Sequence, residues 1–166
     1  MRTCLSTIKV KHSSFHSEQK KGKMSSSYDT SSSPNNTNAN PSVEKKLKAL
    51  MVYDNRVITM IHKTLLKRFG VEPHEAKNGQ EVVLAHRSGA YFDLILMDLD
   101  MPVVNARQTI KELRDMNVRS LIVGLTFLEE EEEKKPFMDA GLNYCYPKPL
   151  PFDVVRDLVE KIKEDA

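Results

Sequence analysis

The chain has 166 residues, of which 40% are hydrophobic and 29% charged, with two cysteines and a formal net charge of +2. These values fit one ordinary globular domain and exclude a fibrous or a wholly disordered protein. Two cysteines make no disulfide framework, no apolar run is long enough to span a bilayer, and the N-terminal residues lack the apolar centre of a secretory signal. We therefore predict an intracellular protein, in the cytoplasm, the nucleus or both, without membrane contact.

Residues 1–46 are predicted to form a disordered basic tail. They contain eight Lys or Arg and only three Asp or Glu. Their central stretch, residues 24–41, reads MSSSYDTSSSPNNTNANP, with Tyr28 as its only large apolar side chain. Such a segment buries too little surface to offset its conformational entropy. Met24 is an alternative translation start that the sequence leaves open, and organelle targeting is a lesser alternative for the tail.

Residues 47–166 are predicted to form the folded domain. They contain 17 Lys or Arg and 20 Asp or Glu, a mildly acidic balance that is unlike a surface built to bind DNA. Short apolar runs alternate with stretches of helical period, which is typical of strand-helix units around a parallel sheet. The five predicted strands are residues 47–52, 71–76, 92–97, 120–125 and 142–146.

The second predicted strand contains Pro73, which removes a backbone donor and confines this strand to the edge of the sheet. With right-handed crossovers, an edge second strand gives the order 2-1-3-4-5 as the simplest topology. We therefore predict a flavodoxin-like α/β fold, with a doubly wound five-stranded parallel sheet and helices on both faces. In such a sheet the binding crevice lies at the carboxyl ends of the strands.

Polar residues follow the predicted strands at this carboxyl edge. They are Tyr53 and Asp54 after the first strand, Asp98 and Asp100 after the third, Thr126 after the fourth and Lys148 after the fifth. Asp54 and Asp98 end adjacent strands, and two hard oxygen ligands in a site open to water suit Mg²⁺. A lysine and a threonine opposite them can neutralise and hydrogen-bond a phosphoryl group. The set therefore predicts phosphoryl-transfer chemistry.

Four segments of the domain resemble a known family. LMVYDN, FDLILMDLDMP, IVGLT and AGLNYCYPKPL are similar, in order and spacing, to the signature segments of the response-regulator receiver domain of two-component signalling. The likeness covers about residues 47–164. In KNGQEVV and LNYCYPKPL the chain looks nearest to plant type-C response regulators, which resemble the receivers of hybrid histidine kinases and carry no DNA-binding output domain.

This resemblance implies a role for each residue at the edge. Asp98 would be the phosphoacceptor, taking a phosphoryl group from a phosphohistidine on a histidine phosphotransfer protein or a hybrid histidine kinase. Mg²⁺ would be bound by the Asp54 and Asp98 side chains and by the backbone carbonyl of Asp100, whose side chain would be a solvated neighbour. Thr126 would hydrogen-bond a phosphoryl oxygen. Lys148 would neutralise charge, and the peptide bond that follows it would be cis.

The resemblance also implies a wider setting. It points to a monomer in plant cytokinin-type signalling, without direct DNA binding. By the same likeness, a phosphatase-like drain of phosphoryl groups from phosphotransfer proteins is a further option.

Two residues depart from the family pattern. Tyr53 stands where the family has the first of two acids, and a phenol with a pKa of about 10 is neutral and cannot hold a metal through water. Losing such a group weakens metal affinity about 10- to 100-fold, so we expect weakly bound Mg²⁺. Alternatively, the Tyr53 ring simply packs against its neighbours. Cys145 replaces an aromatic residue of the family and is expected to be a small buried apolar residue.

Two further expectations concern helices and histidines. Pro136, which follows the run EEEEEKK, is expected to begin or break the fourth helix. His62, His74 and His86 have no mutual metal-ligand spacing and are expected at the surface or boundary of the fold.

Two rival functions stay open on the sequence. The first is a receiver-like binding module that docks phosphotransfer proteins without taking phosphate, which Tyr53 motivates. The second is a phosphohydrolase of the haloacid-dehalogenase type, because DLDMP also resembles the Asp-x-Asp signature of that class. That signature normally follows the first strand of a larger fold with a cap, whereas Asp98 follows the third predicted strand here.

Overall fold

The computed structural model describes residues 45–101 and 105–165. The expectations for the tail, including its disorder and the alternative start at Met24, fall on residues 1–44 and lie outside the described residues.

Strands and helices alternate throughout the described part of the chain. In order they are β1 (Lys48–Val52), α1 (Arg56–Arg68), β2 (Glu72–Ala76), α2 (Gly79–Arg87), β3 (Leu94–Asp98), α3 (Ala106–Asp115), β4 (Leu121–Thr126), α4 (Glu131–Asp139), β5 (Tyr144–Pro147) and α5 (Phe152–Glu164). Each observed strand begins and ends within two residues of its predicted limits. The alternation of short runs with stretches of helical period therefore located the strands correctly.

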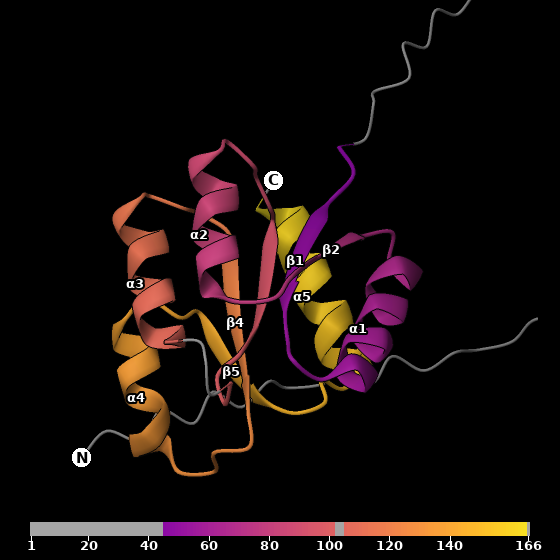
Figure 1. Ribbon diagram of the computed structural model, residues 1–166. Coiled ribbons are helices and arrows are strands. Elements are labelled where there is room, and N and C mark those ends of the chain that lie inside the picture. The colour runs from indigo at the N-terminus through magenta and orange to yellow at the C-terminus, as the bar shows by residue number, and fades with distance from the viewer. Residues whose placement is uncertain (1–44, 102–104, 166) are drawn as a thin grey trace, which may run out of the picture. The chain divides into compact units, whose positions relative to one another are not determined.

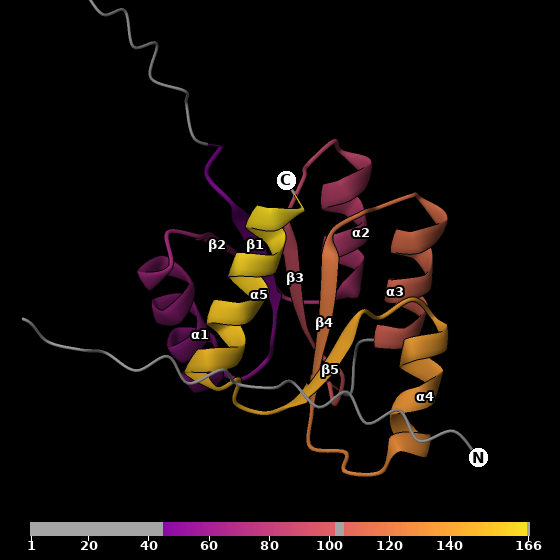
Figure 2. The same ribbon diagram turned by 180° about the vertical axis from the view of Figure 1, so that it is seen from behind.

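The strands form one sheet in the order β2-β1-β3-β4-β5, and each neighbouring pair is parallel. The predicted flavodoxin-like topology is confirmed. Figures 1 and 2 show α1 and α5 on one face of the sheet and α2, α3 and α4 on the other. Right-handed crossovers place the helices on both faces and leave β2, with its proline, at an edge.

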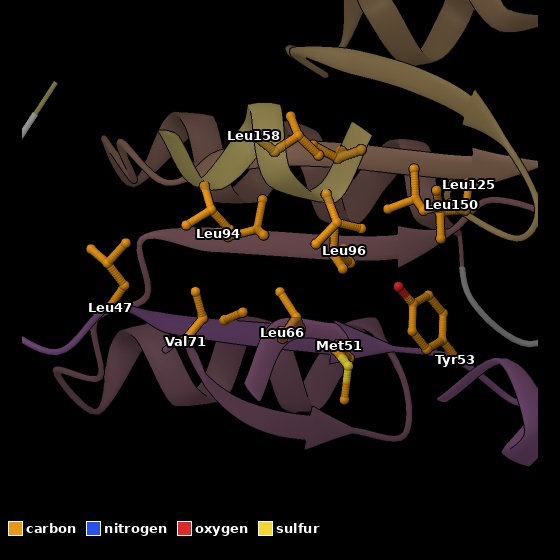
Figure 3. Packing of buried hydrophobic residues seen from close by; sticks show 14 residues of the cluster. Leu47, Met51, Tyr53, Leu66, Val71, Leu94, Leu96, Leu125, Leu150 and Leu158 are labelled. Carbon is orange, nitrogen blue, oxygen red and sulfur yellow. The ribbon is translucent and has the colours of Figure 1, made fainter. Parts of the chain in front are cut away.

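Alternate residues of each central strand enter two separate cores. On β1, Ala49 and Met51 pack toward α1 and α5, whereas Leu50 and Val52 pack toward α2 and α3. The side-chain period of a strand is two, and a parallel sheet covered on both faces buries both sets. Tyr53 continues the first set, and Figure 3 shows its ring at one end of this core.

Three helices that start at the carboxyl edge begin with an asparagine cap. The side chain of Asn55 accepts hydrogen bonds from the Val57 and Ile58 amides of α1. Asn78 and Asn105 cap α2 and α3 in the same way. Because a capping side chain satisfies amides that have no helical partner, these residues fix where each helix begins and how the loops at this edge run.

Helix α4 differs from the expectation for Pro136, which was wrong. The helix runs from Glu131 through Pro136 to Asp139 without a break. A proline inside a helix removes one amide donor, here the partner of the Glu132 carbonyl. None of the described residues of α4 is buried, so water can serve that carbonyl. Three glutamates in the first turn also favour the start of the helix through its dipole.

Candidate phosphoacceptor site

The structure gathers the predicted edge residues at the carboxyl ends of the strands. Asp98 ends β3, Thr126 ends β4, and Lys148 follows β5 directly. The pairing of β3 with β4 continues one residue past Asp98, because the Leu99 amide donates to the Leu125 carbonyl at 2.9 Å. Parallel strands bring all their carboxyl ends to one edge, which is why residues so far apart in sequence meet here.

Lys148 lies between two carboxylates. Its Nζ atom is 2.5 Å from Asp98 Oδ1 and 2.9 Å from Asp100 Oδ2. The side chains of Lys148 and Asp98 are each only 4% exposed, so this pair is shielded from water. Two carboxylates sharing one ammonium leave a net negative charge, which favours a cation. The peptide bond from Lys148 to Pro149 is cis, as predicted.

The Asp100 side chain is not the solvated neighbour that the sequence suggested, and that expectation was wrong. Thr126 Oγ1 donates to Asp100 Oδ1 at 2.6 Å, and the Phe127 amide donates to Asp100 Oδ2 at 2.8 Å. The Asp100 amide in turn donates to Asp98 Oδ1 at 2.8 Å. Such a local side-chain turn folds the chain back after a strand and carries the second carboxylate toward the end of β4.

These contacts set the charge state of Asp100 and Lys148. Burial alone would raise the pKa of Asp100, but hydrogen bonds from Lys148, Thr126 and Phe127 outweigh it and hold the pKa below its usual range. Burial alone would lower the pKa of Lys148, and its bonds to Asp100 and Asp98 instead raise it. Both groups are therefore charged at neutral pH.

The depressed pKa of Asp100 predicts an acid-dependent loss of stability. A carboxyl whose folded pKa is lowered stabilises the fold above its unfolded pKa of about 4, and this contribution is lost as the pH falls through the folded value. Asp100→Asn should therefore flatten the fall in the free energy of unfolding below about pH 4. Thr126→Val should flatten it in part. Urea titrations at stepped pH measure this, and an unchanged acid slope in Asp100→Asn would contradict it.

The two carboxylate oxygens of Asp98 differ in their hydrogen bonding. Both bonds recorded for its side chain fall on Oδ1, from Lys148 and from the Asp100 amide. Within the described residues, Oδ2 has no hydrogen-bond donor. An ionised carboxylate oxygen without a donor is able to bind a cation or to act as a nucleophile.

The residues present fit a magnesium ion. Asp54 is exposed at the end of β1, the strand next to β3, and it pairs with no side chain of the described region. Mg²⁺ is commonly held by one or two carboxylates and keeps several waters, so an all-protein cage is not required. No group of three or more His, Cys, Asp or Glu among the described residues is placed to hold a metal alone. Asp54, Asp98 and the Asp100 carbonyl stay the predicted ligands.

Tyr53 is packed into the core, as its second interpretation suggested. Tyr53 is 9% exposed, and the centroid of its ring lies 5.3 Å from that of His62. The Tyr53 hydroxyl is 3.0 Å from His62 Nδ1. Burial, and after it the charge of Asp98, raise the pKa of Tyr53 well above its usual value. Tyr53 therefore stays a neutral phenol and supplies no carboxylate to a metal.

His62 lies fully buried on α1, so its expected place at the surface or boundary was wrong. It stands one helical turn before Leu66, which is also fully buried, whereas the neighbouring Ile61 is 41% exposed. The buried face of α1 therefore contains His62 and not Ile61. The i to i+4 spacing of His62 and Leu66 was the available signal. His74 and His86 are half-buried, as expected for boundary residues.

Cys145 of β5 is half-buried beside the core on the α2–α4 face, not fully buried. Burial raises the pKa of its thiol, so this cysteine is not an activated nucleophile. Among the described residues, no helix is long and apolar enough to cross a membrane.

A doubly wound parallel sheet with acids, a hydroxyl and a lysine at its carboxyl edge defines the class of phosphoacceptor receiver domains. Comparison with known sequences agrees: residues 49–161 match the model of the response regulator receiver domain, and the chain belongs to this family.

The chain is similar to two plant response regulators and to a solved receiver domain. It is 49% identical over 111 residues to two-component response regulator ARR22 of Arabidopsis thaliana, covering 65% of this chain and 78% of that protein. It is 44% identical over 119 residues to two-component response regulator 24 of the same plant, covering 72% and 86%. The receiver domain of Ssk1, solved with the histidine phosphotransfer protein Ypd1 of Saccharomyces cerevisiae, aligns with a TM-score of 0.60 at 29% identity, covering 72% and 88%.

Proposed function

We propose that this protein accepts a phosphoryl group from a phosphohistidine onto Asp98 in a His-to-Asp phosphorelay. The observation that supports this most is the state of Asp98, a buried carboxylate whose Oδ1 is held by Lys148 while Oδ2 carries no donor from the described residues. A nucleophile needs one free lone pair and a fixed orientation, and this arrangement supplies both.

The proposed step is an in-line displacement at phosphorus. Asp98 Oδ2 forms the new P–O bond, the P–N bond to the donor histidine breaks, and the imidazole leaves with the bonding electrons and takes up a proton. Lys148, 2.5 Å from Oδ1, balances the charge of the acyl phosphate. Thr126 now donates to Asp100. We infer that this hydroxyl turns to a phosphoryl oxygen once the group has arrived.

Magnesium is the proposed cofactor, bound by the Asp54 and Asp98 side chains and the Asp100 carbonyl. When bound, it supplies charge neutralisation for the transferred group. Its affinity is expected to be about 10- to 100-fold below that of a site with a further outer carboxylate, because Tyr53 is a buried phenol.

The proposed donor is a histidine phosphotransfer protein or a hybrid histidine kinase. Support comes from the likeness to the Ssk1 receiver, whose structure contains the phosphotransfer protein Ypd1. The likeness to two Arabidopsis response regulators supports a plant pathway, for which we propose cytokinin-type signalling. We further propose a monomer in the cytoplasm or nucleus, without direct DNA binding.

The test is a transfer assay on the full chain. A phosphorylated histidine phosphotransfer protein, incubated with the chain and Mg²⁺, should pass its label to it within minutes, and hydroxylamine should release that label as an acyl phosphate. Chelation of Mg²⁺ should slow the transfer at least about tenfold. Failure of the folded chain to take label at millimolar Mg²⁺ would contradict the proposal.

A binding module is the second candidate, and two observations favour it. Lys148 already pairs with both Asp98 and Asp100, and Tyr53 leaves the metal without an outer acid. Tight binding of the phosphotransfer protein without uptake of label would select this function. A haloacid-dehalogenase-type phosphohydrolase is not proposed, because DLDMP follows β3 of the sheet and the family match covers the same residues.

A further inference from the structure

A buried chain of hydrogen bonds connects the loop after Lys148 to the end of β1. The Leu150 amide donates to His62 Nε2 at 3.0 Å, and His62 Nδ1 lies 3.0 Å from the Tyr53 hydroxyl. His62 and Leu150 are 0% and 2% exposed. Neither His62 nor the Tyr53 hydroxyl has a part in the phosphoryl transfer described above.

The direction of these hydrogen bonds follows from the Leu150 backbone amide, whose role as a donor is fixed. A backbone amide can only donate, so Nε2 of His62 must be an acceptor and carries no proton. Burial also lowers the pKa of His62 to about 4, so the ring is neutral at pH 7. A neutral imidazole has one proton, which must then be on Nδ1. His62 therefore donates to the Tyr53 oxygen, and the phenol keeps its own proton for another acceptor.

The sheet register brings the Tyr53 and Asp98 positions to neighbouring strand ends, and among the described residues no hydrogen bond joins their two side chains. Val52 pairs with Met97, and Tyr53 and Asp98 are the next residue on each strand. Both continue the set of residues that face α1 and α5, which on β3 contains Leu94 and Leu96. In Figure 3 the Tyr53 hydroxyl points toward the end of β3. Burial, and after it the charge of Asp98, raise the pKa of Tyr53.

We propose that Tyr53 donates a hydrogen bond to the phosphoryl group once that group is bound to Asp98, and that His62 is the positioning residue that holds the Tyr53 hydroxyl in this orientation. Tyr53 thus contributes a neutral donor where the family has an acid. The Leu150 amide selects the tautomer of His62, and this tautomer leaves the Tyr53 proton free to be donated. The segment that follows Lys148 therefore controls the direction in which the Tyr53 hydroxyl donates. The role of Tyr53 rests on the proposed function, whereas the tautomer of His62 does not.

The first test is independent of phosphate. Nitrogen-15 NMR of the full chain at pH 7 should show His62 as the neutral tautomer with its proton on Nδ1. The His62 signal should not titrate between pH 5 and 8, because burial lowers the pKa of His62 to about 4. A proton on Nε2 would overturn the proposal even if the chain takes label normally.

The second test separates the two bonds of His62 by substitution. In His62→Gln the amide carbonyl lies near the former Nε2 and can still accept from Leu150, but it no longer reaches Tyr53. In His62→Asn the amide lies near the former Nδ1 and can still donate to Tyr53, but it loses Leu150. Thermal unfolding of each variant reports how far the fold itself is affected.

Phosphotransfer rates then decide the role of Tyr53. Tyr53→Phe should slow transfer about tenfold, the size expected for one hydrogen bond to a charged group. His62→Gln should slow it similarly, the double variant no further, and His62→Asn less. Tyr91→Phe, which changes an exposed tyrosine, is the matched control and should keep the wild-type rate. Wild-type transfer in Tyr53→Phe, or additive losses in the double variant, would overturn the proposal, whereas no transfer in any chain would count against the phosphoacceptor function alone.

Discussion

Asp98→Asn should abolish transfer of a phosphoryl group to the chain without unfolding it. Asparagine keeps the shape of the side chain, but its amide is neither a nucleophile nor an anionic ligand for a metal. Lys148 retains Asp100 as a partner at 2.9 Å, so the ammonium is not left unpaired. Labelling from a phosphorylated histidine phosphotransfer protein, followed by gel autoradiography, measures the effect. Thermal unfolding verifies that the variant is folded.

Asp100→Asn is the matched control for this loss. Asp100 lies two residues away and contacts the same lysine, but in our account it serves the metal only through its backbone carbonyl. Its replacement also frees the Thr126 hydroxyl, so transfer should stay at no less than about a tenth of the wild-type rate. Equal labelling of Asp98→Asn and wild type, or complete loss in Asp100→Asn alone, would remove Asp98 from its assigned role.

Lys148→Met should separate metal binding from chemistry. The substitution removes the ammonium that is 2.5 Å from Asp98 Oδ1 while keeping much of the buried stem. Removal of one preorganised charge from a buried site typically lowers the rate about 10²- to 10³-fold, so we expect a loss of at least about 100-fold in transfer. Mg²⁺ affinity should rise, because a cation no longer competes for the same carboxylates.

The control for this substitution is Lys134→Met. Lys134 pairs with Glu131 at 2.8 Å on α4, and no ion pair joins it to Asp54, Asp98 or Asp100. It should leave both transfer and Mg²⁺ affinity unchanged. Calorimetric titration with Mg²⁺ measures the affinity directly. A Lys148→Met chain that loses metal binding and transfer together would show that the lysine supports the site as a whole and does not act on the phosphoryl group.

The sheet was predictable because its signal is local. The central strands are short apolar runs, Pro73 marks the edge strand, and the handedness of the crossovers leaves one simple order. The order then brings Asp98, Thr126 and Lys148 to a common edge, so their proximity followed from topology without any side-chain detail. The family resemblance added the proposed roles.

What the sequence did not predict depends on contacts between distant segments. The hydrogen bonds from Thr126 and Phe127 to the Asp100 carboxylate depend on how far β4 extends relative to β3. The hydrophobic pattern does not specify this alignment. The burial of His62 needs two partners, Tyr53 and Leu150, from separate strand ends. The hydrophobic pattern alone assigns a polar residue on a helix to the surface, because the sequence does not show which distant residues will become its buried hydrogen-bond partners.

The continuation of α4 through Pro136 has a different cause. Propensity predicts a break because the ring removes a hydrogen bond inside the helix. The helix has no buried residue among those described, so the freed carbonyl is hydrated and the acidic first turn supports the remaining bonds. Local propensity was overridden here by solvent exposure, which the sequence pattern did not reveal.

Locating the phosphoryl group tests the central claim most directly. After transfer from a phosphohistidine donor, the acyl phosphate is reduced with borohydride, which converts the modified aspartate to homoserine, and the peptide that contains FDLILMDLDMP is sequenced by mass spectrometry. Our account predicts homoserine at position 98 alone. Conversion at Asp100 or Asp54, with Asp98 unmodified in a chain that has taken up label, would contradict it.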